Sequence, residues 1–311
     1  MSLPPAPCPE NPPERRVVVP RWMAYFRPED PAQILRSLIR VVVFIISAFV
    51  LWWLVAGVMA HFVDLLITSA VSLGVTAFIT TVVMMRIYEM RPFYLVGLIP
   101  NRQGAVHLGA GVVFGAGSSF LVVATQWAFG WAEFQRTTLE PLWGATIASG
   151  FLILLVGATG EELLFRGYAF QHLICAFGPW FSITLTSALF AWAHTANPAS
   201  SPVGMVNTAL FGAVFGYAYW RTRDLWFPLG MHFAWNFTLA SVGAKVSGLK
   251  IKLMGISVTP TGPVVWSGGE YGPEGSLLST MALAGTVLFL WKAPLGRQEL
   301  ALVSGRKGGL E

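Results

Sequence analysis

Long runs of apolar residues constrain this chain most, because each is close to the length that crosses a lipid bilayer. A membrane-spanning helix needs about 20 predominantly apolar residues. Runs of this kind, one of them short, lie at 38–60, 65–87, 105–130, 142–164, 179–194, 203–220, 225–241 and 275–292. Only 11% of the residues are charged, against about 25% in a soluble domain. The sequence therefore predicts an all-α, polytopic membrane helix bundle with about eight transmembrane helices.

Lys and Arg residues are distributed unevenly around these runs. With the N-terminus in the cytoplasm, sixteen of the 20 lie on cytoplasmic flanks, and the exceptions are Arg136, Lys245, Lys250 and Lys252. Because basic flanks stay in the cytoplasm, we expect an integral, multi-pass protein with both termini cytoplasmic, in the plasma membrane if the host is bacterial. The net charge of +5 then suits anionic lipid headgroups. No basic groove interleaved with aromatic residues suggests nucleic acid as a partner.

Composition also divides the chain into segments. Residues 1–30 are Pro-rich and precede every long apolar run, which favours a flexible cytoplasmic tail over a signal peptide. Cys8 and Cys175 provide neither a disulfide framework nor a thiolate metal site. The remaining predicted segments are N-terminal membrane helices at 31–140, a polar-motif core at 141–241, an extracytoplasmic loop at 242–274 that could carry a short hairpin, a last membrane helix at 275–293 and a cytoplasmic tail at 294–311.

Three charged residues lie at the end of the fourth run, where charge is costly unless it faces a partner or a wet cavity. Glu162 and Arg166 are four residues apart, and so only about 40° apart around a helix. Glu161 and Arg166 are separated by about 140°. The spacing predicts that Glu162 pairs with Arg166 and that Glu161 is free to exchange a proton. A carboxylate in an apolar site suits a general base near neutral pH.

Polar residues also interrupt two later apolar runs. If the Gly-Pro dipeptide at 178–179 turns an antiparallel helical hairpin, Glu161 and His194 lie at nearly one depth. His232 and Asn236 are four residues apart and share one helix face. Two imidazoles, a carboxamide and a spare carboxylate can therefore converge from the fourth, fifth and seventh predicted helices. Each feature alone also fits a structural role, such as a buried clasp or hydrogen bonds between helices.

These residues carry a resemblance to a known family. The stretches EELLFR (161–166), FAWAH (190–194) and HFAWN (232–236) resemble the E-E-x-x-x-R, F-x-x-x-H and H-x-x-x-N motifs of the CPBP family, in the family's order. That family comprises intramembrane CAAX proteases, including the type II CAAX prenyl endopeptidases, and bacteriocin-processing or immunity proteins. The resemblance covers about residues 140–240 and makes the segment 141–241 a CPBP-like catalytic membrane core.

The resemblance implies an intramembrane endopeptidase that hydrolyses a peptide bond near the C-terminus of a membrane-associated or lipidated, for example prenylated, protein or peptide. Glu161 would activate the attacking water and His194 would hold or deprotonate it. His232 and Asn236 would stabilise the oxyanion. The supporting residues would be Glu162, Arg166 and Phe190.

Two alternatives stay open on the sequence. Zinc could be held by His194, His232 and Glu161, with an open position for water. The sequence lacks an H-E-x-x-H motif, and we prefer a mechanism that needs no cofactor. The second alternative is a non-catalytic transporter, scaffold or immunity protein that uses the same buried polar network as a proton relay or a clasp.

Overall fold

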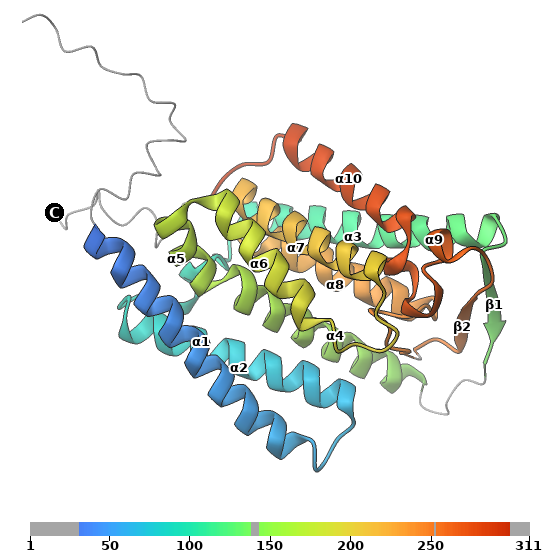
Figure 1. Ribbon diagram of the computed structural model, residues 1–311, viewed down its shortest axis with the longest axis horizontal. Helices are drawn as coiled ribbons and strands as arrows, with labels where there is room; N and C mark the ends of the chain where they lie inside the picture. Colours follow the sequence, from blue (N-terminus) through green and yellow to red (C-terminus); the bar gives the residue numbers. More distant parts are fainter. Residues whose placement is uncertain (1–30, 138–142, 252, 299–311) are drawn as a thin grey trace, which may run out of the picture.

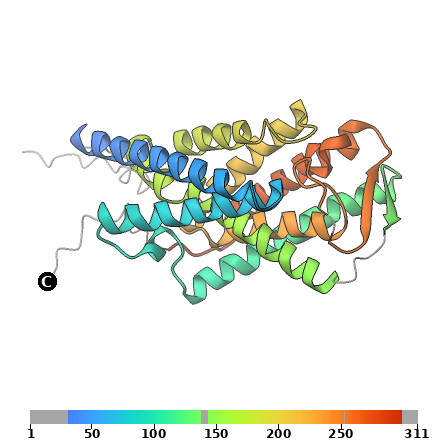
Figure 2. The ribbon, with the colours of Figure 1, turned by 90° about the horizontal axis from the view of Figure 1, so that it is seen from below.

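The computed structural model describes residues 31–137, 143–251 and 253–298. The helices form an elongated bundle in which α1 and α2 make one flank and α10 the opposite flank (Figure 1), and α1 and α2 run side by side in both views (Figures 1 and 2). The helices of the bundle are α1 (Pro31–Met59), α2 (Leu65–Ile87), α3 (Arg102–Ala128), α4 (Trp143–Arg166), α5 (Tyr168–Phe177), α6 (Pro179–Ala193), α7 (Pro202–Thr222), α8 (Trp226–Ser241) and α10 (Leu277–Lys292).

Every predicted apolar run overlaps one of these helices. Among the described residues, four helical stretches are long and apolar enough to cross a membrane, namely α1, α2, α3 and Gly144–Phe177, which comprises most of α4 together with α5. The prediction of a helical membrane bundle is therefore confirmed, whereas the number of eight crossings stays a prediction. The predicted tail at 1–30, with Cys8, and the end of the second tail at 299–311 lie outside the described residues.

Four helix starts are fixed by side chains that accept hydrogen bonds from otherwise unpaired backbone N–H groups. In each case the acceptor precedes the helix and the donor lies three residues further on. The capping residues are Asp64 at α2, Asn101 at α3, Ser201 at α7 and Ser276 at α10. Ser201 is followed by Pro202 at the first helical position, where a missing N–H costs nothing.

The helix that carries the charged residues does not run straight on to residue 177. It ends at Arg166, and Gly167 (φ −82°, ψ −125°) redirects the chain into α5. A side chain at Gly167 would place its Cβ 2.2 Å from the Leu163 carbonyl oxygen, so only glycine permits this bend. Gly178 (φ +82°) then turns the chain into α6, which begins at Pro179. The expected Gly-Pro turn is present, and the helix directly before it is the ten-residue α5.

A small antiparallel ribbon lies at one end of the bundle (Figure 1). Strand β2 (Ile256–Pro260), in the predicted extracytoplasmic loop, pairs with β1 (Ala132–Arg136), which follows α3. The register places Phe134 opposite Val258. Strand β2 therefore pairs with a strand of the α3–α4 connection and does not form the hairpin that was expected within its own loop. Short helical turns complete this region: α9 (Val264–Ser267), η2 (Gly269–Tyr271) and η3 (Pro273–Gly275), while η1 (Phe93–Val96) follows α2.

Glycines let the helices around the polar residues approach closely. A Cβ at Gly115 on α3 would lie 2.3 Å from the carbonyl oxygen of Met231 on α8. A Cβ at Gly160 on α4 would lie 2.8 Å from Gly74 Cα on α2. Met231 and Gly160 directly precede His232 and Glu161. Small residues at helix crossings are a general device of membrane bundles, and here they fix the backbone beside both predicted reactive residues.

Candidate active site

Glu162 and Arg166 form a buried ion pair within the last turn of α4. Arg166 Nη1 donates to Glu162 Oε1 over 3.3 Å, and both side chains are almost fully shielded from solvent. Arg166 Nη2 donates to the Gly212 carbonyl oxygen on α7 over 3.1 Å. A Cβ at Gly212 would lie 3.2 Å from Arg166 Nη2, so the absence of a side chain leaves room for this contact. The i, i+4 spacing predicted this pairing.

Aromatic rings surround the guanidinium group of Arg166. Its Cζ lies 4.5 Å from the ring centre of Phe190, 5.3 Å from Phe215 and 5.6 Å from Phe165. Rings at such distances attract a cation through their quadrupole. The rings exclude water from the ion pair. Arg166 is therefore held by the charge of Glu162, by the Gly212 carbonyl oxygen and by packing against the three rings.

His232 lies between the two glutamates. Its Nδ1 donates to Glu162 Oε1 over 2.8 Å, and its Nε2 lies 3.6 Å from Glu161 Oε2. The Phe215 ring stacks on the imidazole, with ring centres 5.0 Å apart and an angle of 16° between the planes. Glu162 Oε1 therefore accepts from both Arg166 and His232, and this shared acceptor fixes the orientation of the imidazole.

His194 approaches Glu161 from the end of α6. Its Nδ1 donates to the Phe190 carbonyl oxygen over 2.8 Å, since a carbonyl oxygen can only accept. Its Nε2 then points toward Glu161 Oε2, at 4.0 Å. Both imidazoles are thus held through Nδ1 and turn Nε2 toward the same carboxylate oxygen. The structure brings Glu161, His194 and His232 together from α4, α6 and α8.

Asn236 lies one helical turn after His232 on α8 and is partly buried. Within the described residues, no hydrogen bond or ion pair joins its side chain to the other three predicted residues. Its predicted role as an oxyanion donor stays a prediction. Phe190, expected only as a supporting residue, contacts Arg166 with its ring and His194 with its carbonyl oxygen.

Among the described residues, the arrangement leaves two buried carboxylate oxygens of the site without a hydrogen-bond donor, Glu162 Oε2 and Glu161 Oε2. Within the part of the chain that the structure describes, Glu161 Oε2 has no hydrogen-bond partner, although two ring nitrogens face it at 3.6 Å and 4.0 Å. These separations exceed a normal hydrogen bond. A buried carboxylate oxygen favours a partner that donates a hydrogen bond, and neither imidazole is close enough to be that partner.

The same atoms are the ligands that the sequence suggested for zinc. Two imidazoles whose Nδ1 atoms are anchored by a carboxylate and a carbonyl are typical of zinc ligands. Among the described residues, however, no group of three or more His, Cys, Asp and Glu side chains is placed so that it could hold a metal ion. The distances between Glu161 Oε2 and the two Nε2 atoms would have to shorten to form such a set.

Sequence reasoning missed two features of the site. The first is the contact between Glu162 and His232, which depends on how α8 packs on α4 and has no signature in residue spacing. The second is a further buried carboxylate, Glu274, that accepts a hydrogen bond from Trp235 Nε1 over 3.1 Å. Trp235 lies between His232 and Asn236 in the HFAWN stretch, and the need of a buried indole N–H for an acceptor was the one available signal.

The chain matches one family model over residues 142–238, and that family is described as Type II CAAX prenyl endopeptidase Rce1-like. This range contains all three polar motifs and leaves α1 to α3, the ribbon and α10 outside. The match confirms the resemblance that the motifs indicated. No curated protein and no solved structure matches the chain.

Proposed function

We propose that the chain hydrolyses a peptide bond of a membrane-associated substrate, on the premise that its segment 142–238 belongs to the Type II CAAX prenyl endopeptidase Rce1-like family of intramembrane proteases. The expected substrate is a lipidated or otherwise membrane-bound protein or peptide, cut near its C-terminus. The protein is expected to cross the membrane about eight times with both termini in the cytoplasm.

The single observation that supports this proposal most is the unsatisfied oxygen of Glu161. Glu162 Oε1 already accepts from Arg166 and His232. Glu162 Oε2 and Glu161 Oε2 both lack a donor among the described residues, but it is Glu161 Oε2 that two imidazole Nε2 atoms face. A water molecule between these groups would give the carboxylate its missing donor. It would also be held next to a base, which is what hydrolysis requires.

The reaction then follows from these positions. Glu161 takes a proton from the water while the water oxygen bonds to the substrate carbonyl carbon, and His194 Nε2 accepts the second hydrogen bond of the water. The carbonyl oxygen becomes an oxyanion, which Asn236 and a doubly protonated His232 stabilise by donation. When the C–N bond breaks, the proton on Glu161 passes to the leaving amine.

The clasp of Glu162 and Arg166 has a positioning role in this scheme. It does not touch the reacting atoms, but it fixes the Nδ1 side of His232 and so directs Nε2 toward the substrate. A zinc ion, if bound, would be held by His194, His232 and Glu161 and would supply Lewis acidity to the same water. We propose the mechanism without metal, because Glu161 suffices as the base.

A peptidase assay on the detergent-purified full chain tests the proposal. The probe is a quenched fluorescent peptide with a prenylated cysteine followed by three residues, together with its unprenylated analogue. Glu161→Gln should remove nearly all turnover, because the amide keeps the shape but cannot accept the proton. Glu133→Gln, at an exposed position on β1, is the matched control and should match the wild type.

Two outcomes would contradict parts of the proposal. Solute flux without any peptide cleavage would favour the transporter alternative, and a scaffold would show neither activity. Metal analysis separates the mechanisms: stoichiometric zinc whose removal by a chelator stops cleavage, and whose return restores it, would overturn the metal-free mechanism while keeping the protease. Activity of chelator-treated, zinc-free protein would support Glu161 as the base.

A further inference from the structure

The segment between α8 and α10 covers the ribbon end of the bundle (Figure 1). We call residues 244–251 and 253–276 the cap. The cap lies outside the range that matches the family and contains β2, α9, η2 and η3. It has charged and polar groups that the proposed reaction does not use, and two of them, the Glu274 side chain and the Ser247 carbonyl oxygen, reach the segments that carry the two site histidines.

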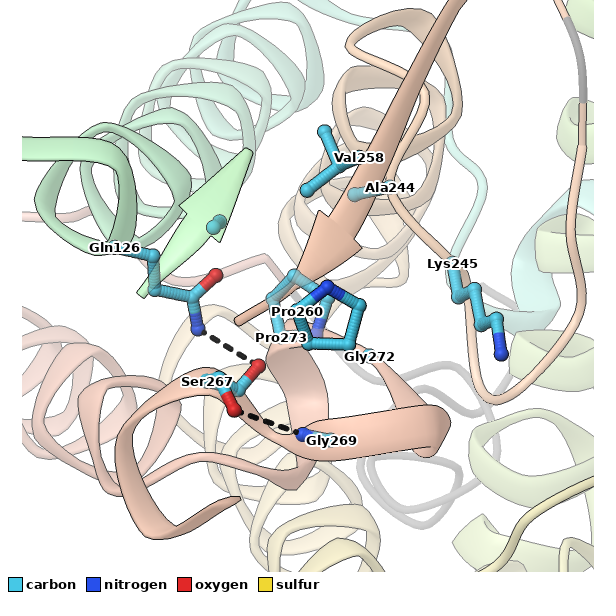
Figure 3. A pocket seen from close by; sticks show the side chains of 10 residues that line it. Gln126, Ala244, Lys245, Val258, Pro260, Ser267, Gly269, Gly272 and Pro273 are labelled. Carbon is cyan, nitrogen blue, oxygen red and sulfur yellow. Dashed lines mark hydrogen bonds between the residues drawn. The ribbon is translucent and has the colours of Figure 1, made fainter. Parts of the chain in front are cut away.

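The cap is attached to the end of α3. Gln126, which is buried, donates from Nε2 to the carbonyl oxygens of Trp266 and Ser267 over 2.9 Å and 3.1 Å. Figure 3 shows Gln126 beside a small hollow in the cap, with Ser267 bonded to Gly269 N. Within the described residues, none of the four site residues Glu161, His194, His232 and Asn236 lines this hollow, so it is an anchoring region and not the substrate site.

Glu274 is the buried acidic side chain of the cap. Its Oε1 accepts from Trp235 Nε1 over 3.1 Å, and its Oε2 accepts from the backbone N–H and the hydroxyl of Ser247, the latter over 3.0 Å. Three donors on two oxygens suit a carboxylate better than a neutral amide or acid. Trp235 is almost fully buried, so this bond links the cap rigidly to the third residue after His232.

A second connection leads from the same point to His194. Ser247, held by Glu274, accepts at its carbonyl oxygen from Asn197 Nδ2 over 3.1 Å. Asn197 N in turn donates to the His194 carbonyl oxygen over 3.0 Å. The neighbouring Gly248 has φ +84°, and a Cβ there would lie 1.9 Å from the Pro198 carbonyl oxygen. The cap thus lies directly against the loop that follows His194.

The backbone of Glu274 is fixed as well. Asn207 on α7 donates from Nδ2 to the Glu274 and Ser276 carbonyl oxygens over 2.7 Å and 2.8 Å. Its Oδ1 accepts from Thr280 on α10 over 2.7 Å. The Glu274 side chain is therefore presented by a rigid support, and its contacts to Trp235 and Ser247 are not those of a mobile surface loop.

From these contacts we propose, on the basis of the function proposed above, that Glu274 is a positioning residue of the reaction: its carboxylate holds the His232 helix through Trp235 and the His194 loop through Ser247 and Asn197. It acts on both imidazoles through contacts that are separate from the Glu162–Arg166 clasp. The distance between the two Nε2 atoms and Glu161 then depends on the cap as well as on α4.

The test compares Glu274→Gln with Glu270→Gln in the full chain. Glu270 belongs to the same cap but is exposed, and it pairs with Lys245 at the surface. Glu274→Gln should lower kcat on the prenylated probe peptide about tenfold or more, the loss expected for one charge-assisted hydrogen bond, with little change in KM. Glu270→Gln should leave both constants unchanged. Rates are normalised to the fraction of folded protein, because unfolded molecules would lower the apparent kcat without changing KM.

Trp235→Phe removes the indole donor together with part of the bicyclic ring, and keeps a smaller aromatic side chain. It should lower kcat to a similar degree, and combining it with Glu274→Gln should add little, because the two changes break the same bond. Additive losses in kcat, or a wild-type kcat in Glu274→Gln, would overturn the proposal. Amide hydrogen exchange provides a readout that does not depend on activity. Residues 194–201 and 232–236 should exchange faster in Glu274→Gln than in the wild type, whereas their exchange rates in Glu270→Gln should equal those of the wild type.

The exchange measurement also separates this inference from the function on which it rests. If Glu161→Gln still cleaves the probe, the proposed function fails, whatever the cap does. If Glu161→Gln is inactive but Glu274→Gln keeps wild-type exchange at both histidine segments, the function survives and the positioning role of Glu274 is wrong.

Discussion

Replacing Glu162 by Gln should separate the stabilising role of the buried clasp from its role in orienting His232. The amide keeps the size of the side chain and retains one acceptor oxygen. It loses the negative charge that Arg166 Nη1 meets at 3.3 Å and His232 Nδ1 meets at 2.8 Å. One substitution therefore weakens two charge-assisted bonds that converge on a single atom.

The expected magnitudes follow from the burial of the pair. Arg166 and Glu162 are 0% and 1% exposed, and breaking such a pair by neutralising one partner costs about 3–5 kcal/mol. The weakened bond to His232 corresponds to about 1.5–3 kcal/mol. If the bond is needed in the transition state, kcat falls roughly 10–150-fold. We expect Glu162→Gln to melt at a lower temperature and to keep a residual activity that Glu161→Gln lacks.

The double variant Glu162→Gln/Arg166→Met provides the control. Replacing a buried ion pair by neutral side chains of similar size is often close to neutral for stability, so the double variant should recover much of the lost melting temperature. It should not recover kcat, because His232 still lacks its carboxylate. Thermal melts and steady-state kinetics on the same preparations measure both. A double variant with wild-type kcat would refute the orienting role of Glu162.

Three further predictions address other parts of the molecule. Gly115→Ala should lower the melting temperature and kcat, since its Cβ would lie 2.3 Å from a carbonyl oxygen of α8, whereas Gly117→Ala, with nothing within 4 Å, should not. Phe215→Leu should reduce kcat about threefold to tenfold by removing the ring stacked on the site imidazole. Burial raises the pKa of Glu89, but the nearby side chains of His172, Tyr168 and Arg40 outweigh this and lower it. The stability it contributes is therefore present above its unfolded pKa and lost as the pH falls from about 5 towards 3. Melts across this range should show a smaller loss in Glu89→Gln than in the wild type.

Features governed by spacing along one helix could be predicted from the sequence. The i, i+4 rule assigned Arg166 to Glu162, and that pair is present. The hairpin argument put Glu161 and His194 at one depth, and their reactive atoms lie 4.0 Å apart. The two residues meet although Gly167 breaks the helix that the argument assumed to be continuous.

Features that depend on the packing of distant segments could not be predicted. Phe215 reads like any apolar residue of a membrane helix, and nothing in its neighbourhood in the sequence marks it as the ring that stacks on His232. Glu274 lies in a Gly- and Pro-rich loop, where a carboxylate is normally solvated. Its burial results from Trp235, Ser247 and Asn207, which belong to three other parts of the chain.

The gradient of exposure across the site gives a physical reason for two adjacent glutamates. Side-chain exposure rises from 0% at Arg166 and 1% at Glu162 to 8% at His232, 15% at His194 and 22% at Glu161. A base must meet water and must be able to change its charge. Glu162 can do neither, because losing its charge would leave Arg166 buried and unpaired. Glu161 lies at the accessible end and can accept a proton without disturbing that pair. In the proposed mechanism, the buried glutamate therefore fixes the orientation of the groups around Glu161, and each glutamate could take the other's role only in the other's surroundings.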